Sequence, residues 1–257
     1  MRKLRTALAL GAAALAARGI GMARPVSAKG AFLDWDEMLP GTAAKGFSEV
    51  PDATRGPTGE EARIYVGNAD CVSPPNSLVY DFADWPDGRT RGYAALALPA
   101  AAEGWTVLSF CFRKESGAAS AELRGLYDRP GETFNGVARA WPFLWIALDD
   151  FLTVRAEGAR RWDAVRVGAV LPGVWHRVSF RIPPPGSAGQ AASATLERRK
   201  ADGSFATVAS ERVPFGELVL RRVAAFDLTG TGPCRILFDD FAFAPETWYD
   251  PDASGSP

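Results

Sequence analysis

Residues 175–182 read WHRVSFRI, and the alternation within this stretch decides the fold. The residues expected to face a core are His176, Val178, Phe180 and Ile182. The residues expected to face outward are Trp175, Arg177, Ser179 and Arg181. A period of two residues belongs to a β-strand, whereas an α-helix has a period of 3.6. The stretch therefore predicts a half-buried strand, with the one histidine of the chain on its apolar face.

Similar runs, rich in β-branched and aromatic residues, recur on both sides of this stretch between clusters of Pro, Gly, Asp and Asn. They lie at 77–82, 92–98, 106–114, 119–127, 143–148, 152–156, 192–199, 206–213, 218–227 and 235–244. Asp202-Gly203 is a hairpin-type turn, and Pro183–Gly186 ends a strand because proline cannot donate to a ladder. About eleven short strands and almost no helical periodicity predict an all-β fold, a two-sheet antiparallel jelly-roll sandwich.

The N-terminus has the pattern of a secretory signal peptide, which we predict at residues 1–28. A basic start at Arg2, Lys3 and Arg5 precedes an apolar stretch at 6–17 and the small residues 26–28. The apolar stretch is shorter than the ~20 residues of a membrane-spanning helix, and a disordered Ala-rich arm is the alternative. We therefore expect an exported protein, periplasmic or extracellular, with no transmembrane segment in the mature chain. One sandwich domain at 29–250 and a disordered tail at 251–257 complete the expected organisation.

Composition excludes several classes of function. A net charge of −1 offers no field for nucleic acid, and 47% hydrophobic residues suffice for a core. The three cysteines, Cys71, Cys111 and Cys234, are too few and too widely spaced for a disulfide scaffold or a CxxC metal site. One pair can bridge in an oxidising compartment, whereas Cys111 and Cys234, inside apolar runs, are expected to be small buried hydrophobic residues.

Catalytic motifs are mostly missing. The lone His176 is expected to face the core, no GxSxG elbow accompanies it, and the chain has neither a P-loop nor a dinucleotide-binding motif. Asp149-Asp150 and Asp239-Asp240 are adjacent pairs, so on a strand their side chains point to opposite faces and neither pair alone flanks one glycosidic bond. Two-carboxylate catalysis would need alternate positions or separate strands.

An aromatic stripe is the most unusual local feature. With Leu144, Ile146 and Leu148 facing the core, strict alternation places three rings together on the opposite face, at Trp141, Phe143 and Trp145. Flat rings of this kind stack on the apolar face of a pyranose. Further candidate ligand-binding residues nearby are Tyr127, Arg129 and Trp162. Burial of the stripe under a loop, either 156–163 or 126–139, is the structural alternative.

The order of segments resembles the concanavalin A-like lectin/glucanase superfamily, including LamG-like and carbohydrate-binding-module jelly rolls of exported bacterial proteins. The stretches that carry the resemblance are FLDW at 32–35, LPG at 39–41, SPPNSL at 73–78, GVWHRV at 173–178 and ILFDDF at 236–241. The resemblance implies a concanavalin A-like sandwich. It also implies a structural calcium between the N-terminal segment and the last strand, with the candidate ligands Asp34, Asp36, Asp239 and Asp240.

These observations favour an exported, non-catalytic carbohydrate-binding or cell-surface recognition domain whose partner is a polysaccharide or glycan. The enzyme alternative is a polysaccharide lyase or glycoside hydrolase of the same fold. The superfamily's lyases use Tyr, His and Arg or Lys on the concave sheet, and here Tyr127 and Arg129 match while His176 is expected to point away. The second alternative is a structural protein of the envelope that binds proteins along exposed strands.

Overall fold

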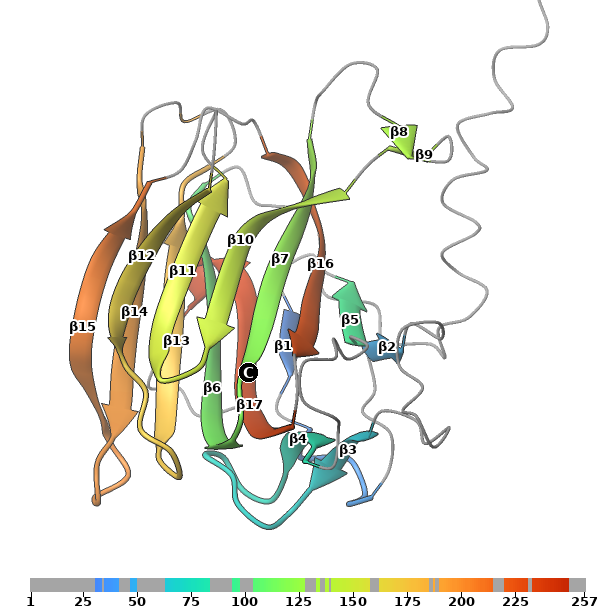
Figure 1. Cartoon of the computed structure of the whole chain (residues 1–257), viewed down its shortest axis with the longest axis vertical. Helices are drawn as coiled ribbons and strands as arrows, with labels where there is room; N and C mark the ends of the chain where they lie inside the picture. The colour runs from blue at the N-terminus through green and yellow to red at the C-terminus, as the bar shows by residue number, and fades with distance from the viewer. Residues whose placement is uncertain are drawn as a thin grey trace, which may run out of the picture.

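Two antiparallel sheets lie face to face and form a sandwich (Figure 1). The computed structural model describes residues 31–33, 35–41, 47–49, 63–83, 94–97, 104–127, 133–134, 137–138, 140–157, 162–184, 187, 190–214, 220–230 and 233–249. The predicted signal peptide and C-terminal tail lie outside these ranges. Among the described residues, none forms a helix with the length and apolar character that a membrane span requires. The predicted all-β, two-sheet antiparallel sandwich is confirmed.

The eight-stranded sheet has the order β15-β14-β13-β6-β17-β4-β3, with β1 pairing to β17. Its strands are β1 (Ala31–Leu33), β3 (Arg63–Gly67), β4 (Ser77–Phe82), β6 (Thr106–Ser116), β13 (Trp175–Ile182), β14 (Ala192–Arg199), β15 (Phe205–Val213) and β17 (Cys234–Pro245). A 3-10 helix, η1 (Glu246–Trp248), follows β17.

The seven-stranded sheet has the order β12-β11-β10-β7-β16-β5-β2. Its strands are β2 (Phe47–Glu49), β5 (Ala94–Ala97), β7 (Ala119–Tyr127), β10 (Ala140–Leu148), β11 (Phe151–Glu157), β12 (Trp162–Ala169) and β16 (Leu220–Gly230). A small hairpin of β8 (Thr133–Phe134) and β9 (Val137–Ala138) stands apart from both sheets (Figure 1).

Each of the eleven predicted runs corresponds to a strand, and four have the predicted bounds: β4, β7, β13 and β14. The short strands β1, β2, β3, β8 and β9 were not predicted, because two to five residues give too little periodicity to recognise. β12 was also missed. It pairs with β11 within the seven-stranded sheet, so residues 156, 157, 162 and 163 of the proposed covering loop belong to strands, and the rest of that loop lies outside the described residues.

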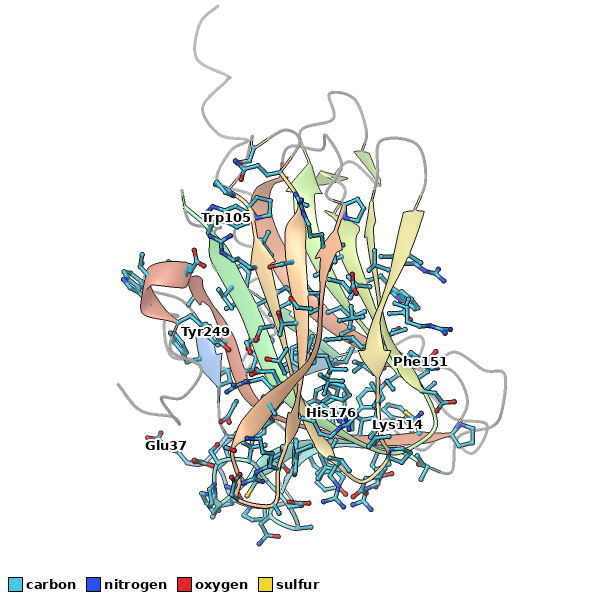
Figure 2. All side chains as sticks on the ribbon, turned by 90° about the vertical axis from the view of Figure 1, so that its left-hand side faces the viewer. Glu37, Trp105, Lys114, Phe151, His176 and Tyr249 are labelled. Atoms are coloured by element: carbon cyan, nitrogen blue, oxygen red, sulfur yellow. The ribbon has the colours of Figure 1, made fainter. Side chains whose placement is uncertain are left out.

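The core lies between the sheets and is built from the alternating inward residues of both. In β13 the inward set is as predicted: Val178 and Phe180 are fully buried, and His176 is buried beside them. Phe110 and Phe112 from β6 meet Leu144 and Ile146 from β10 in the same cluster. Each such side chain contributes about 1.5–3 kcal/mol when it leaves water. Figure 2 shows the two layers from the side, with His176 between them.

The outward residues of β13 are less exposed than alternation predicts. Trp175 is 4% exposed and Arg177 is 8% exposed, although both lie on the face that points away from the core. Val79, Cys111 and Leu237 join Trp175 in a second apolar cluster, against which Val72 packs. Here the segment preceding β4 crosses the outer face of the eight-stranded sheet, so this sheet is covered on both faces at that end. Cys71, Cys111 and Cys234 are free thiols, and the last two are buried as predicted.

We predict that Gly117→Ala destabilises the protein far more than Gly173→Ala. Both glycines have positive φ, +67° and +72°, where any other residue loses about 1–2 kcal/mol. A Cβ at Gly117 would lie 1.8 Å from the carbonyl oxygen of Pro233, whereas a Cβ at Gly173 would meet nothing within 4 Å. Overpacking adds about 1–3 kcal/mol at Gly117. Urea unfolding of both variants measures the difference, and equal losses would contradict the predicted close approach of Pro233.

Candidate functional site

The aromatic residues singled out in the sequence come together at one end of the seven-stranded sheet. Tyr127 ends β7, Trp141 and Phe143 lie near the start of β10, and Trp162 begins β12. Because neighbouring strands are antiparallel, the end of β7 and the start of β10 meet at the same edge, and Glu157↔Trp162 places the start of β12 there too. Arg129 lies outside the described residues.

The three-ring stripe depended on unbroken alternation along β10, and that alternation is interrupted. Pro142 pairs with Arg124 of β7, whereas Leu144 pairs with Leu123, so β10 has one extra residue at this point. Such a β-bulge changes the phase of the strand by one position. Alternation therefore does not carry from Trp145 back to Trp141. The side chains of Trp141 and Phe143 are outside the described part of the chain, and a shared face for all three rings stays a prediction.

Trp145 does lie on the outer face of the seven-stranded sheet. It is partly buried, its neighbours Leu144 and Ile146 face the core, and its register partner on β11 is Arg155. The guanidinium carbon of Arg155 lies 4.6 Å from the centre of the indole ring. On the same sheet, Arg166 lies 4.0 Å from the ring of the exposed Phe151. Arginines stacked on rings keep their N–H groups available at the edge, where they can meet hydroxyl or carboxylate oxygens.

The register continues from Trp145 onto two acidic residues that sequence reasoning did not select. Trp145 pairs with Glu122 of β7, and Glu122 pairs with Asp227 of β16. These two positions are 105 residues apart in the sequence, and no local motif connects them. Only the strand order β10-β7-β16 brings them together, so a signal in the sequence would have required the sheet topology in advance.

His176 does not contribute to this outer face. It is fully buried, its ring stacks on Phe112 at 5.5 Å, and the backbone N–H of Leu171 donates to its Nε2 at 3.4 Å. Burial lowers the pKa of His176 to about 4, so the ring is neutral at physiological pH. A buried, neutral imidazole between the sheets has no access to a polysaccharide, and the predicted inward direction of His176 is confirmed.

Asp239, a predicted calcium ligand, is fully buried in β17 and holds the segment that precedes β4. Its Oδ2 accepts hydrogen bonds from the backbone N–H groups of Val72 at 2.7 Å and Ser73 at 3.1 Å. Its Oδ1 accepts the N–H of Asp240 at 2.9 Å. Burial, followed by the nearby carboxylate of Asp240, raises the pKa of Asp239 to about 8 in spite of these donors.

The other described calcium candidates also have protein partners. Asp240 has a φ of +48° and accepts a hydrogen bond from Ser73 Oγ at 2.6 Å, and Asp36 accepts the N–H of Asn76 at 3.3 Å. Arg199 donates to the carbonyl oxygens of Cys71 and Val72 beside them. Within the part of the chain that the structure describes, no group of three or more His, Cys, Asp or Glu residues is arranged to hold a metal.

The described residues therefore do not form a calcium cage, since the cation would compete with N–H donors and with a guanidinium. Asp34 lies outside the described residues, so the predicted calcium stays a prediction. Thermal melts in calcium chloride and in EDTA test it, and equal melting temperatures would contradict it. A higher melting temperature with calcium would show that undescribed groups such as Asp34 complete a site around Asp36, Asp239 and Asp240.

We further predict that Asp239 makes stability depend on pH. A folded-state pKa of about 8, above the ordinary 3.8, means that the folded protein holds this proton more tightly than the unfolded chain. The stabilisation is complete below the unfolded pKa and is lost as the pH rises through the folded value. Wild type should thus lose stability relative to Asp239→Asn between about pH 4 and about pH 8, as thermal melts can measure. His176 titrates in both proteins, so its contribution cancels; a constant difference would contradict the shift.

Several solved structures are similar to this chain at low sequence identity. No protein-family model matches the chain, and no curated protein matches its sequence. A PL-14 alginate lyase from Aplysia kurodai is 12% identical over 71% of this chain and 87% of its own, with a TM-score of 0.47. A second alginate lyase is 10% identical over 85% and 97%, with a TM-score of 0.49. A seed lectin from Lotus tetragonolobus is 12% identical over 79% and 94%, with a TM-score of 0.39.

Similarities of this size concern the fold alone, which in this chain is a two-sheet antiparallel sandwich. The similar structures include a lectin as well as alginate lyases.

Proposed function

We propose that this protein binds a polysaccharide or glycan on the outer face of the seven-stranded sheet, as an exported carbohydrate-binding or cell-surface recognition domain. The observation that carries the proposal is the Trp145–Arg155 pair. It combines a flat apolar ring with a guanidinium 4.6 Å above it, both outside the core and on neighbouring strands. A ring accepts the C–H face of a pyranose, and an adjacent guanidinium donates to its hydroxyl oxygens.

Trp162 lies near this pair, because it begins β12 and pairs with Glu157 of β11, two residues beyond Arg155. Tyr127 and Trp141 lie at the same end of the sheet but beyond the bulge in β10, so alternation does not place them on one face with Trp145. An extended ligand that crosses β10 and β11 would pass over Trp145 and Arg155.

The alternatives are disfavoured by different observations. A lyase that depends on histidine is disfavoured because His176 is fully buried between the sheets. A structural envelope protein that binds along exposed strands is disfavoured because the long edge strand β15 packs beside β12, the edge strand of the other sheet. Export is part of the proposal, and a mature N-terminus after Ala28, found by mass spectrometry, would support it.

We predict that Trp145→Ala weakens polysaccharide binding at least about tenfold, the loss that follows removal of a central aromatic contact. Affinity gel electrophoresis of the mature protein in gels that contain soluble glucans, xylan, mannan or alginate measures this loss. Trp248→Ala is the matched control, because Trp248 is 46% exposed but follows the eight-stranded sheet. Retardation that Trp145→Ala leaves unchanged, or no retardation of wild type in any gel, would overturn the proposal.

A further inference from the structure

We propose that Phe151 and Arg166 form a second subsite on the binding face, and that this subsite and the Trp145–Arg155 pair together select a polysaccharide with acidic groups. The inference rests on the proposed function, because it concerns the same face of the seven-stranded sheet. It goes beyond that function by assigning a second contact for the ligand and the chemical class of the ligand.

Phe151 and Arg166 both lie on the outer face of the seven-stranded sheet. Leu152 and Val167, the next residues in β11 and β12, are buried in the core between the sheets. Because successive strand residues lie on opposite faces, Phe151 and Arg166 point away from that core. Phe151 is 36% exposed, and Arg166 is exposed as well. Figure 2 shows Phe151 on the side of this sheet that points away from His176.

The same arrangement of ring and guanidinium occurs twice on this face. The guanidinium carbon of Arg166 lies 4.0 Å from the centre of the Phe151 ring, and that of Arg155 lies 4.6 Å from the centre of the Trp145 ring. In each pair the ring comes from one strand and the arginine comes from the next strand of the sheet. Stacking holds each guanidinium in place before a ligand arrives, so less side-chain freedom is lost on binding.

The two subsites are separated along the strands. Phe151 and Arg155 are four residues apart on the same face of β11, which corresponds to about 13 Å along the strand. Arg166 pairs with Thr153, midway between them, and reaches toward Phe151, whereas Arg155 reaches toward Trp145 on β10. An extended chain that lies along β11 therefore passes both guanidinium groups, and each subsite contacts a different part of it.

The charges of these two arginines distinguish them from other arginines of the protein. Four arginines of the eight-stranded sheet each form an ion pair with a carboxylate: Arg113, Arg177, Arg181 and Arg235. In the described ranges, Arg155 and Arg166 stack on rings and have no ion-pair partner. An exposed guanidinium without a counter-charge attracts an anion, and its planar fork fits the two oxygens of a carboxylate or a similar oxyanion.

Two carboxylates between β10 and β11 do not supply the counter-charge, because each has a partner of its own. Asp149 Oδ1 accepts the backbone N–H of Phe151 at 3.0 Å. Asp150 Oδ1 lies 3.0 Å from Nζ of Lys114, which belongs to β6 of the other sheet. The positive charges of Arg155 and Arg166 thus stay available for a ligand.

The register gives the face a direction. The cross-strand row that begins at Arg155 continues through Trp145 and Glu122 to Asp227, in the order β11, β10, β7 and β16. The basic position lies on one side of Trp145, and the acidic positions lie on the other side. Because like charges across an interface weaken binding, an acidic polysaccharide fits over β10, β11 and β12 and not over β7 and β16.

Matched pairs of polysaccharides test the class of the ligand with the mature protein at pH 7.5. Polygalacturonate and its methyl ester share a backbone and differ in the carboxylate, whereas dextran sulfate and dextran differ in the sulfate. We expect stronger retardation by the acidic member of at least one pair in affinity gels, and the pair that responds identifies the acidic group. The excess retardation should fall as NaCl is added, because salt screens exposed charges.

Substitutions at the second subsite test its contribution. Arg166→Gln and Phe151→Ala should each weaken binding of the acidic polysaccharide about fivefold, the scale of one exposed charge contact. Arg166→Gln should leave the retardation by the neutral member of the pair unchanged. Arg212→Gln is the matched control, because it removes an exposed arginine from β15 of the other sheet, and it should bind like wild type.

Thermal melts show that a loss of binding is not a loss of folding. Arg166 is exposed, so Arg166→Gln should melt at the wild-type temperature. Equal retardation by both members of each pair, or acidic binding that Arg166→Gln and Phe151→Ala leave unchanged, would overturn the inference. Neutral polysaccharides that bind through Trp145 would in that case leave the proposed function standing. Absence of retardation by every polysaccharide, neutral or acidic, would overturn both.

Discussion

The packing of two sheets against one another, with every second residue of each strand directed inward, is the constraint on which the remaining structure depends. It buries Val178, Phe180 and His176 of β13 against residues of the seven-stranded sheet. Once those inward positions are fixed, the outward positions of every strand are fixed as well. A one-residue slip would transfer a whole set of side chains to the wrong face, so burial holds the register. The same register decides which side chains lie on the outer faces of the two sheets. The candidate site lies on one of these faces.

Two local features depart from a simple sandwich and have different effects on its outer faces. The bulge between Pro142 and Leu144 changes the phase of β10, so alternation does not carry from Trp145 to the residues that precede the bulge. On the eight-stranded sheet, the segment that precedes β4 crosses the outer face and buries Trp175, tied down by the buried carboxylate of Asp239. One outer face is therefore partly closed by the chain itself. Trp145, Phe151 and their two arginines lie on the opposite outer face.

Two ionisable groups of the protein have pKa values that their surroundings shift. His176 lies in the core, where burial favours its neutral form. Asp239 lies under a loop, where backbone N–H groups surround it and burial raises its pKa. Each of these groups has a structural partner in place.

Local sequence determined the strands with a clear two-residue period, the direction of His176 and the burial of Cys111 and Cys234, because each follows from neighbours on the same strand. It also selected Trp145. Short strands such as β1 and β3 were not recognised, since few residues carry little periodicity. The bulge in β10 and the row from Arg155 to Asp227 were decided only by tertiary structure. Both depend on which strands are neighbours in the sheet. Neighbouring strands can be far apart in the sequence, and a local sequence pattern carries no information about such contacts.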